Sequence, residues 1–179
     1  MTPDQIFELA YSFDRKAEGG YVVDGGGPTQ GGITQHEYSD WLKRHDMPDN
    51  LVRSITDQEI HQINYEDYWS RFHLDQVANI APLTAIALFD FGENIWPVRP
   101  IEMLQRRCHA VADSIIGGGT LNAIGIAVSL AGGDLPFALQ FNQDRRAWYE
   151  SNSPAADIHG LINRVNALDA YITKISETA

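Results

Sequence analysis

The sequence predicts a mainly α-helical fold with a small β-hairpin near the N-terminus. Apolar side chains recur at helical spacing through most of the chain, often after an N-cap residue or a proline. A glycine-rich stretch at residues 19–32 interrupts this pattern close to the N-terminus. With 179 residues, the chain suits one domain, or one domain with a small appended part, and it can bury a sizeable core.

The first helix is expected to begin at Thr2-Pro3, where an N-cap residue precedes a proline at the first helical position. Its end is expected near Glu18, because two glycines, Gly19 and Gly20, stop a helix. Apolar residues at helical spacing would face the core, namely Ile6, Phe7, Ala10 and Phe13.

Residues 20–34 are expected to form the β-hairpin. Tyr21, Val22 and Val23 favour a strand, and the sequence GGGP at residues 25–28 requires a turn. The hairpin therefore follows directly on the end of the first helix.

Helices account for the rest of the chain. Pro82 opens a run that is apolar almost all round and that Trp96-Pro97 breaks, so we expect a central buried helix there. The sequence TDQE at residues 56–59 is a capping-box pattern and predicts another helix start. Further helices are expected over residues 36–44, 56–69, 99–111, 120–131, 136–149 and 155–175.

Composition excludes several functional classes. The net charge of −11 argues against nucleic acid as a partner, because phosphate binding needs Lys and Arg. The single cysteine, Cys108, allows no intramolecular disulfide and is interpreted as a helix packing residue rather than a nucleophile. We expect no signal peptide, because the acidic N-terminus lacks a basic region followed by a long apolar run. We expect no membrane insertion, because no apolar stretch reaches the ~18 residues that a membrane span needs.

The stretch at residues 18–34, EGGYVVDGGGPTQGGIT, carries the strongest chemical signal. Glycoside hydrolysis needs an acid that protonates the leaving oxygen and a second group that stabilises or attacks the sugar. Glu18 is the expected acid, because the partial negative charge of a helix C-terminus and partial burial both raise a carboxyl pKa. Asp24 and Thr29 are expected to hold a water molecule, or Asp24 to stabilise positive charge on the sugar.

Other candidate residues lie further along the chain. Tyr21 and Trp96 offer aromatic faces on which sugar rings stack, although aromatic side chains also pack in cores. Asn94, in the sequence FDFGEN, suits either a hydrogen bond to an N-acetyl group or a helix C-cap, and both readings stay open. Glu93 is a second carboxylate nearby.

No metal or cofactor is expected. Neither an HExxH sequence nor paired cysteines are present, and GGGPTQGG lacks the ending of a phosphate loop. The histidines are scattered along the chain, at His36, His45, His61, His73, His109 and His159.

The segments EGGYVVD, GGPT, GGIT, LFDFGEN, MLQ and DSIIGGGTLNAI together resemble glycoside hydrolase family 108, over residues 3–175. This resemblance implies an N-acetylmuramidase with a lysozyme-like helical fold, with Glu18 as its catalytic glutamate. It also places the family's GGxT element on residues 26–29 and its GIT element on residues 32–34, so that Thr34 is expected to contact substrate. A motif of a peptidoglycan-binding module falls on residues 113–120.

The order of Glu18, Asp24 and Thr29 also resembles that of phage-type lysozymes, in which an Asp and a Thr position a water molecule. The resemblances imply a catalytic lobe at residues 1–96 and a helical, peptidoglycan-binding-like region at residues 97–179 packed on it. The implied activity is hydrolysis of the β-1,4 bond between N-acetylmuramic acid and N-acetylglucosamine.

The implied setting is that of a phage endolysin that acts as a monomer, is made in the cytoplasm and is released to periplasmic peptidoglycan by a holin. Two alternatives stay open. One is a catalytically inactive wall-binding or virion structural protein on the same fold, and the other is a lytic transglycosylase.

Overall fold

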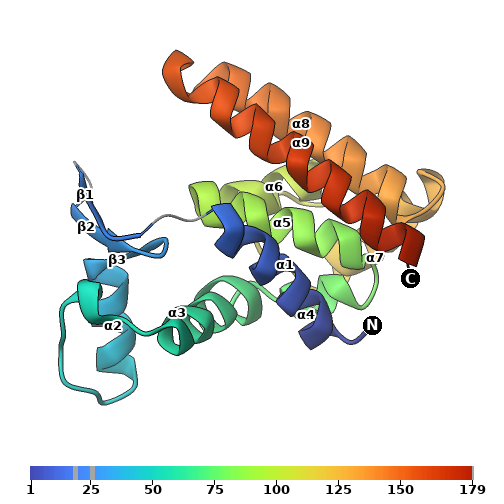
Figure 1. The fold of residues 1–179 in the computed structure, drawn as a ribbon. Helices are drawn as coiled ribbons and strands as arrows, with labels where there is room; N and C mark the ends of the chain where they lie inside the picture. The colour runs from blue at the N-terminus through green and yellow to red at the C-terminus, as the bar shows by residue number, and fades with distance from the viewer. Residues whose placement is uncertain (18–19, 25–26, 179) are drawn as a thin grey trace.

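A computed structural model describes residues 1–17, 20–24 and 27–178 of the chain (Figure 1). The described residues form a mainly α-helical, lysozyme-like fold with a small antiparallel sheet, which confirms the predicted class. No single described helix is long and apolar enough to cross a membrane; only the pair α7 (Gly118–Leu130) and α8 (Asp134–Asn152), bent by 106° relative to each other, has the length and composition for it among the described residues.

Helix α5 (Pro82–Ile95) lies at the centre of the larger part of the molecule. Pro82 occupies its first turn, and residues 83–92 are all buried, as the apolar run predicts. The helices that pack against α5 are α1 (Pro3–Ala17), α4 (Leu74–Ala78), α6 (Val98–Arg107) and α8 (Asp134–Asn152). Helix α9 (Ala155–Thr178) runs back along α8 (Figure 1) and also contacts α5 and α1.

The N-terminus of α5 is capped by a residue from α8. The Asp134 carboxylate accepts hydrogen bonds from the Leu83 N–H at 2.6 Å, the Thr84 N–H at 3.2 Å and the Thr84 hydroxyl at 2.6 Å. Orphan N–H groups at a helix start need such partners. The central helix therefore depends on a side chain about fifty residues further along the chain.

The glycine-rich segment forms three strands rather than a two-stranded hairpin. Strands β1 (Val22–Asp24), β2 (Gly27–Gln30) and β3 (Ile33–Thr34) pair in the order β1-β2-β3, both pairs antiparallel. The extra strand arises because Gly31 and Gly32 both adopt positive φ angles, 56° and 84°, and turn the chain back on β2. The sheet extends to one side of the helices (Figure 1).

A second apolar cluster supports the sheet. It lies beneath β3 and joins helices α2 (Gln35–Arg44) and α3 (Asp57–Ile63) with the short 3-10 helix η1 (Val52–Ser54). Both α-helices begin with a capping box, Thr34 with Glu37 and Thr56 with Glu59. The cluster comprises Ile33, Tyr38, Trp41, Leu42, Val52, Ile55, Ile60 and Ile63.

The helix expected over residues 56–69 changes character midway. After α3 the chain continues as a π-helix, η2 (Asn64–Ser70), in which Asn64 is buried and donates to the Ile60 carbonyl at 2.9 Å. The wider turn lets Tyr68 and Trp69 join the main core while α3 joins the second cluster. This segment is thus the bridge between the two apolar clusters.

The C-terminal elements differ from the expected bounds by a few residues. Helix α6 ends at Arg107 rather than 111, and α7 (Gly118–Leu130) begins before Thr120, with Gly117 at its N-cap. Thr120 is therefore not an N-cap; its hydroxyl donates to the Ile115 carbonyl and accepts from Gln105. The main apolar cluster runs from Ile6 to Ile175, so residues on both sides of position 97 share one core.

Candidate active site

Glu18, the expected acid, lies outside the described residues, immediately after the last residue of α1. The last turn of α1, which leads to Glu18, is held by an ion pair with α9. Asp14, in its last turn, is 2% exposed, and the Arg164 guanidinium of α9 donates to its carboxylate. The chain therefore leaves α1 at a point held against α9.

A buried ion-pair cluster extends from this contact into the core. Arg164 also pairs with Asp90 of α5, with 2.9 Å from its Nε to Oδ1. Asp90 in turn accepts from Arg145 Nη1 at 2.6 Å, and the side chains of Asp90 and Arg145 are 1% and 0% exposed. Burial alone would lower the pKa of Arg164, but the Asp90 and Asp14 carboxylates raise it above its ordinary value. The cluster thus links α1, α5, α8 and α9 through ion pairs.

The sheet places two of the predicted site residues side by side. Thr29 on the middle strand is opposite Thr34 on β3 and opposite Val22 on β1. Asp24 ends β1, paired with Gly27, and its side chain lies outside the described part of the structure. The backbone register thus brings Thr29 and Thr34 together and leaves Asp24 at the outer end of the β1–β2 pair.

Thr34 has a structural task that the sequence analysis did not assign to it. Its hydroxyl accepts from the Glu37 N–H at 3.3 Å and is 2.7 Å from Glu37 Oε2, and Glu37 Oε2 accepts from the Thr34 N–H at 2.9 Å. This is a capping box at the start of α2. The pattern T-x-x-E at residues 34–37 is visible in the sequence and is the signal that would have found it.

Glu37 continues into a second cluster of polar groups. Its Oε1 accepts from the Tyr68 hydroxyl at 2.6 Å. Burial raises the pKa of Tyr68, and the negative charges of Glu93 and Glu37 raise it further. Thr34, Glu37, Tyr68 and Glu93 therefore form one acidic cluster between the sheet and the end of α5. Sequence reasoning singled out Thr34 and Glu93 but missed Glu37 and Tyr68.

The two aromatic candidates have different neighbours. Trp96 follows α5 and has a positive φ of 73°. Its ring lies edge-on to the rings of Tyr68 and Phe72, with centroid distances of 5.4 and 5.7 Å, and the residue is 41% exposed. Tyr21 is 47% exposed and has the Arg53 guanidinium 5.8 Å from its ring centroid. Both rings keep exposed surface, Trp96 beside the acidic cluster and Tyr21 at the start of the sheet.

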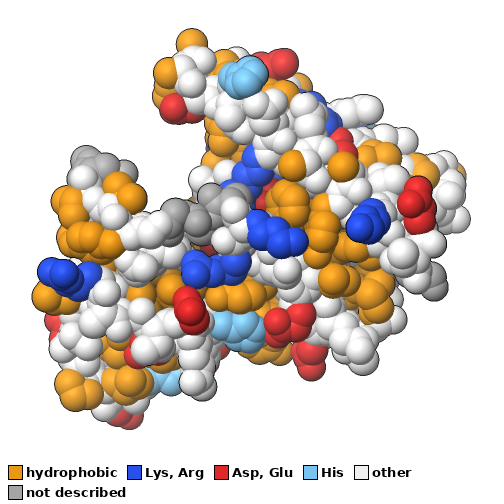
Figure 2. All heavy atoms as spheres, in the orientation of Figure 1, with side chains coloured by type: hydrophobic (Ala, Val, Ile, Leu, Met, Phe, Trp, Pro, Cys, Tyr) orange, Lys and Arg blue, Asp and Glu red, His pale blue; other side chains and the backbone are white. Residues whose placement is uncertain are grey.

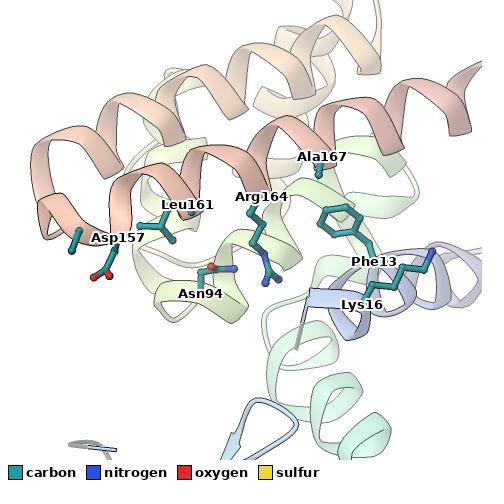
Figure 3. A pocket seen from close by; sticks show the side chains of 9 residues that line it. Phe13, Lys16, Asn94, Asp157, Leu161, Arg164 and Ala167 are labelled. Atoms are coloured by element: carbon teal, nitrogen blue, oxygen red, sulfur yellow. The ribbon is translucent and has the colours of Figure 1, made fainter. Parts of the chain in front are cut away.

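Asn94 lines a large cavity. Its amide donates to the Asp90 carbonyl within α5 at 2.7 Å, whereas the C-cap of α5 is Trp96. The cavity, of about 740 Å³, lies between the ends of α1 and α5 and the N-terminal half of α9 (Figure 3). It is lined by Phe13, Lys16, Asn94, Ala156, Asp157, Gly160, Leu161, Arg164 and Ala167.

The surface around the end of α1 is hollowed. Figure 2 shows a depression between the lobe that carries the sheet and the outer end of α8 and α9, with Lys and Arg side chains gathered over α1 and α9 beside it. The protein is acidic overall, yet this face carries basic groups. Among the described residues no group of three or more His, Cys, Asp or Glu side chains is arranged to hold a metal ion.

Comparisons with known proteins agree with the predicted resemblance. Residues 13–95 match the family model described as Glycosyl hydrolase 108, a range that contains the last turn of α1, the sheet and α5. The chain thus resembles a family of glycoside hydrolases, as its sequence motifs predict.

Among solved structures, the one titled "Structure of Brucella abortus SagA" matches with a TM-score of 0.79 and 24% sequence identity. The match covers 96% of this chain and 95% of that chain, so the two proteins share the whole fold. A comparison with curated proteins finds no match. The expected likeness of residues 113–120 to a peptidoglycan-binding module stays a prediction. In the structure, Asp113 accepts from Gln105 Nε2 at 2.8 Å and from the Ile115 N–H at 2.9 Å, within its own loop.

Proposed function

We propose that this protein is an N-acetylmuramidase, which hydrolyses the β-1,4 bond between N-acetylmuramic acid and N-acetylglucosamine in peptidoglycan. The match of residues 13–95 to Glycosyl hydrolase 108 carries the proposal, because that range contains the last turn of α1 and the sheet, next to which the expected catalytic residues lie in the sequence.

In this proposal Glu18 donates a proton to the leaving glycosidic oxygen. The ion pair between Asp14 and Arg164 supports the assignment, because it holds the last turn of α1 against α9, and a general acid must be held in reach of its oxygen. Asp24 and Thr29 orient the attacking water or stabilise the charge that develops on the sugar. Thr29 lies on the central strand of the sheet, where pairing on both sides limits its movement.

Four further residues are proposed to contact the glycan. Tyr21 and Trp96 keep exposed ring surface for stacking on sugars, and Asn94 faces the cavity. Thr34 is proposed to contact the glycan from its place in the capping box with Glu37, to which its hydroxyl is hydrogen bonded. No cofactor is part of the mechanism.

We infer a phage endolysin that acts as a monomer and that a holin releases to the periplasmic wall. The basic groups around α1 and α9 support a wall substrate, because peptidoglycan carries carboxylates that the acidic remainder of the surface would repel.

The test is the digestion of purified Gram-negative sacculi by wild type, Glu18→Gln and Glu150→Gln, with released fragments identified by mass. Glu150 is an exposed glutamate of α8 and serves as a matched control for the loss of one carboxylate. We expect reducing muramic acid ends from wild type and Glu150→Gln, and none from Glu18→Gln.

Other products would select another function. Anhydro-muramic acid ends would identify a lytic transglycosylase, in which no water attacks the sugar. A wild type that releases nothing but sediments with sacculi would identify a wall-binding or virion structural protein. Full activity in Glu18→Gln would show that Glu18 is not the acid.

A further inference from the structure

The sheet is connected to the central helix through the π-helix η2. The three strands with α2, η1 and α3, here called the sheet lobe, comprise the described residues of 22–63 and lie to one side of α5 (Figure 1). Within the lobe the strands pack on α2 and η1, whereas η2 packs on α3 and also on α4 and α5. Arg15 of α1 donates to the Gly31 carbonyl at 3.3 Å and ties the β2–β3 turn to α1. The position of the sheet relative to α5 therefore depends on the contacts of η2.

A hydrogen bond from η2 holds the start of α2, next to the sheet. The Tyr68 hydroxyl donates to Glu37 Oε1 at 2.6 Å. The other carboxylate oxygen, Glu37 Oε2, accepts from the Thr34 N–H at 2.9 Å. Tyr68 belongs to the main apolar cluster, whereas Glu37 and Thr34 belong to the sheet lobe. Because Thr34 is opposite Thr29 in the strand register, this bond also bears on the position of Thr29.

The ring of Tyr68 contacts the residue that ends α5. Its centroid is 5.4 Å from that of Trp96, and the two rings lie edge to face. Trp96 has φ 73° and ψ 131°, a backbone conformation that residues with a side chain rarely adopt. Such residues persist only where their surroundings hold them, and they gather at functional sites. Tyr68 therefore joins a strained, half-exposed tryptophan, through its ring, to the sheet lobe, through its hydroxyl.

We propose that Tyr68 is a positioning residue for glycan cleavage, which holds the sheet lobe in place relative to Trp96 at the end of α5. This inference rests on the proposed muramidase function, in which Trp96 stacks on a sugar and Thr29 of the sheet orients the attacking water. The rate of attack by a held water on a bound sugar depends steeply on their relative placement. Tyr68 is only 6% exposed, so it acts through its two neighbours rather than on the substrate.

The chain contains a second bond of the same kind, which provides a matched control. The Tyr38 hydroxyl donates to Glu59 Oε1 at 3.0 Å, and Glu59 closes the capping box of α3 with Thr56. Both partners of this bond lie inside the sheet lobe. Tyr38→Phe and Tyr68→Phe therefore remove the same group from the same kind of acceptor, but only Tyr68→Phe cuts a connection between the lobe and η2.

Kinetics on soluble glycan strands, freed from stem peptides by an amidase, test the proposal. We expect Tyr68→Phe to lower kcat by about tenfold to a hundredfold and to leave KM within about twofold of wild type. The reason is that the phenylalanine ring still packs against Trp96, whereas the sheet is no longer held. Tyr38→Phe should keep the kcat of wild type although urea unfolding shows a similar loss of stability in both variants.

A double-variant cycle identifies the bond that is responsible. Glu37→Gln leaves one acceptor oxygen for the donors that Glu37 serves with two, so it should also lower kcat. Because Tyr68→Phe and Glu37→Gln break the same connection, the double variant should lower kcat by no more than about twofold beyond Tyr68→Phe alone. Multiplication of the two separate losses would show that Tyr68 does not act through Glu37.

Hydrogen exchange gives a readout that needs no activity. The Thr34 N–H is bonded to Glu37, so its exchange rate reports how firmly Glu37 is held. We expect this rate, measured by nuclear magnetic resonance, to rise by about tenfold in Tyr68→Phe and by less than about twofold in Tyr38→Phe.

The outcomes separate this proposal from the function on which it rests. If wild type cleaves the strands and the two phenylalanine variants have equal kcat, Tyr68 is not a positioning residue and the muramidase function stands. An unchanged Thr34 exchange rate in Tyr68→Phe overturns the proposal as well. If wild type cleaves nothing, the muramidase function is wrong, and the Thr34 exchange rate then decides by itself whether Tyr68 holds the sheet lobe in place.

Discussion

The buried ion pair between Asp90 and Arg145 predicts a large loss of stability for Asp90→Ala. The two side chains are 1% and 0% exposed, so removal of the carboxylate leaves the Arg145 charge in the core without its 2.6 Å partner. Arg164 loses less, because it keeps its contact with Asp14 and is 15% exposed. Breaking a buried pair in this way costs about 3–5 kcal/mol in the free energy of unfolding.

For a chain of this size, that loss corresponds to a fall of about 6–20 °C in Tm. Urea unfolding followed by circular dichroism measures it, with Asp40→Ala as the control. Asp40 is 57% exposed in its pair with His36, so its loss should change the free energy by less than about 0.5 kcal/mol. The double variant Asp90→Leu with Arg145→Leu should recover part of the loss, because no lone charge then stays buried. A loss below about 1 kcal/mol for Asp90→Ala would refute the reasoning, since it would mean that water reaches Arg145.

Three further predictions concern individual side chains. Thr34→Ala should lower the free energy of unfolding, measured by thermal unfolding, by about 1 kcal/mol, and Thr34→Ser should lower it far less, because the Thr34 hydroxyl caps α2. If Thr34→Ala instead leaves the stability unchanged and abolishes activity, Thr34 is a substrate contact. Burial raises the pKa of the Cys108 thiol to about 11. At pH 8, Ellman's reagent should therefore label Cys108 only as fast as the protein unfolds. Rapid labelling of the native protein would contradict the buried position of Cys108. Hydrogen bonds from the Ile115 N–H and from Gln105 lower the pKa of Asp113 below 3.8 in the folded state. The contribution of the Asp113 carboxylate to stability is therefore present above pH 3.8 and lost as the pH falls through the folded pKa. The difference in the free energy of unfolding between wild type and Asp113→Asn should shrink in acid and not in base.

Local sequence signals predicted much of the fold. Pro82 and the apolar run after it located α5 to within one residue of its end, because a proline at a helix start and a continuous apolar surface depend on neighbours in the chain. The capping-box pattern at residues 56–59 located α3 for the same reason. The π-helix at Asn64–Ser70 was not predicted, because its wider turn serves to aim Tyr68 and Trp69 at a core that the local sequence does not describe.

Some residues of the candidate site could be predicted from the sequence, and others were found only in the structure. The order Glu18, Asp24 and Thr29 could be interpreted from sequence, because a helix end, two glycines and a strand follow one another along the chain. The structure added Glu37 and Tyr68, which meet across 31 positions, and confirmed neither the role of Glu18 nor that of Asp24, since the Glu18 residue and the Asp24 side chain lie outside its described part.

By itself, the sequence determined the helical class, the glycine-rich turn after the first helix and the residue types available for acid catalysis, all of which depend on short-range propensity. Only the tertiary structure decided that Arg164 holds the last turn of α1 through Asp14, a contact across 150 positions. It likewise decided that α9 forms one side of the cavity beside that turn. Pairings of this kind are set by how helices pack around α5, and packing depends on shape and charge in three dimensions rather than on spacing along the chain.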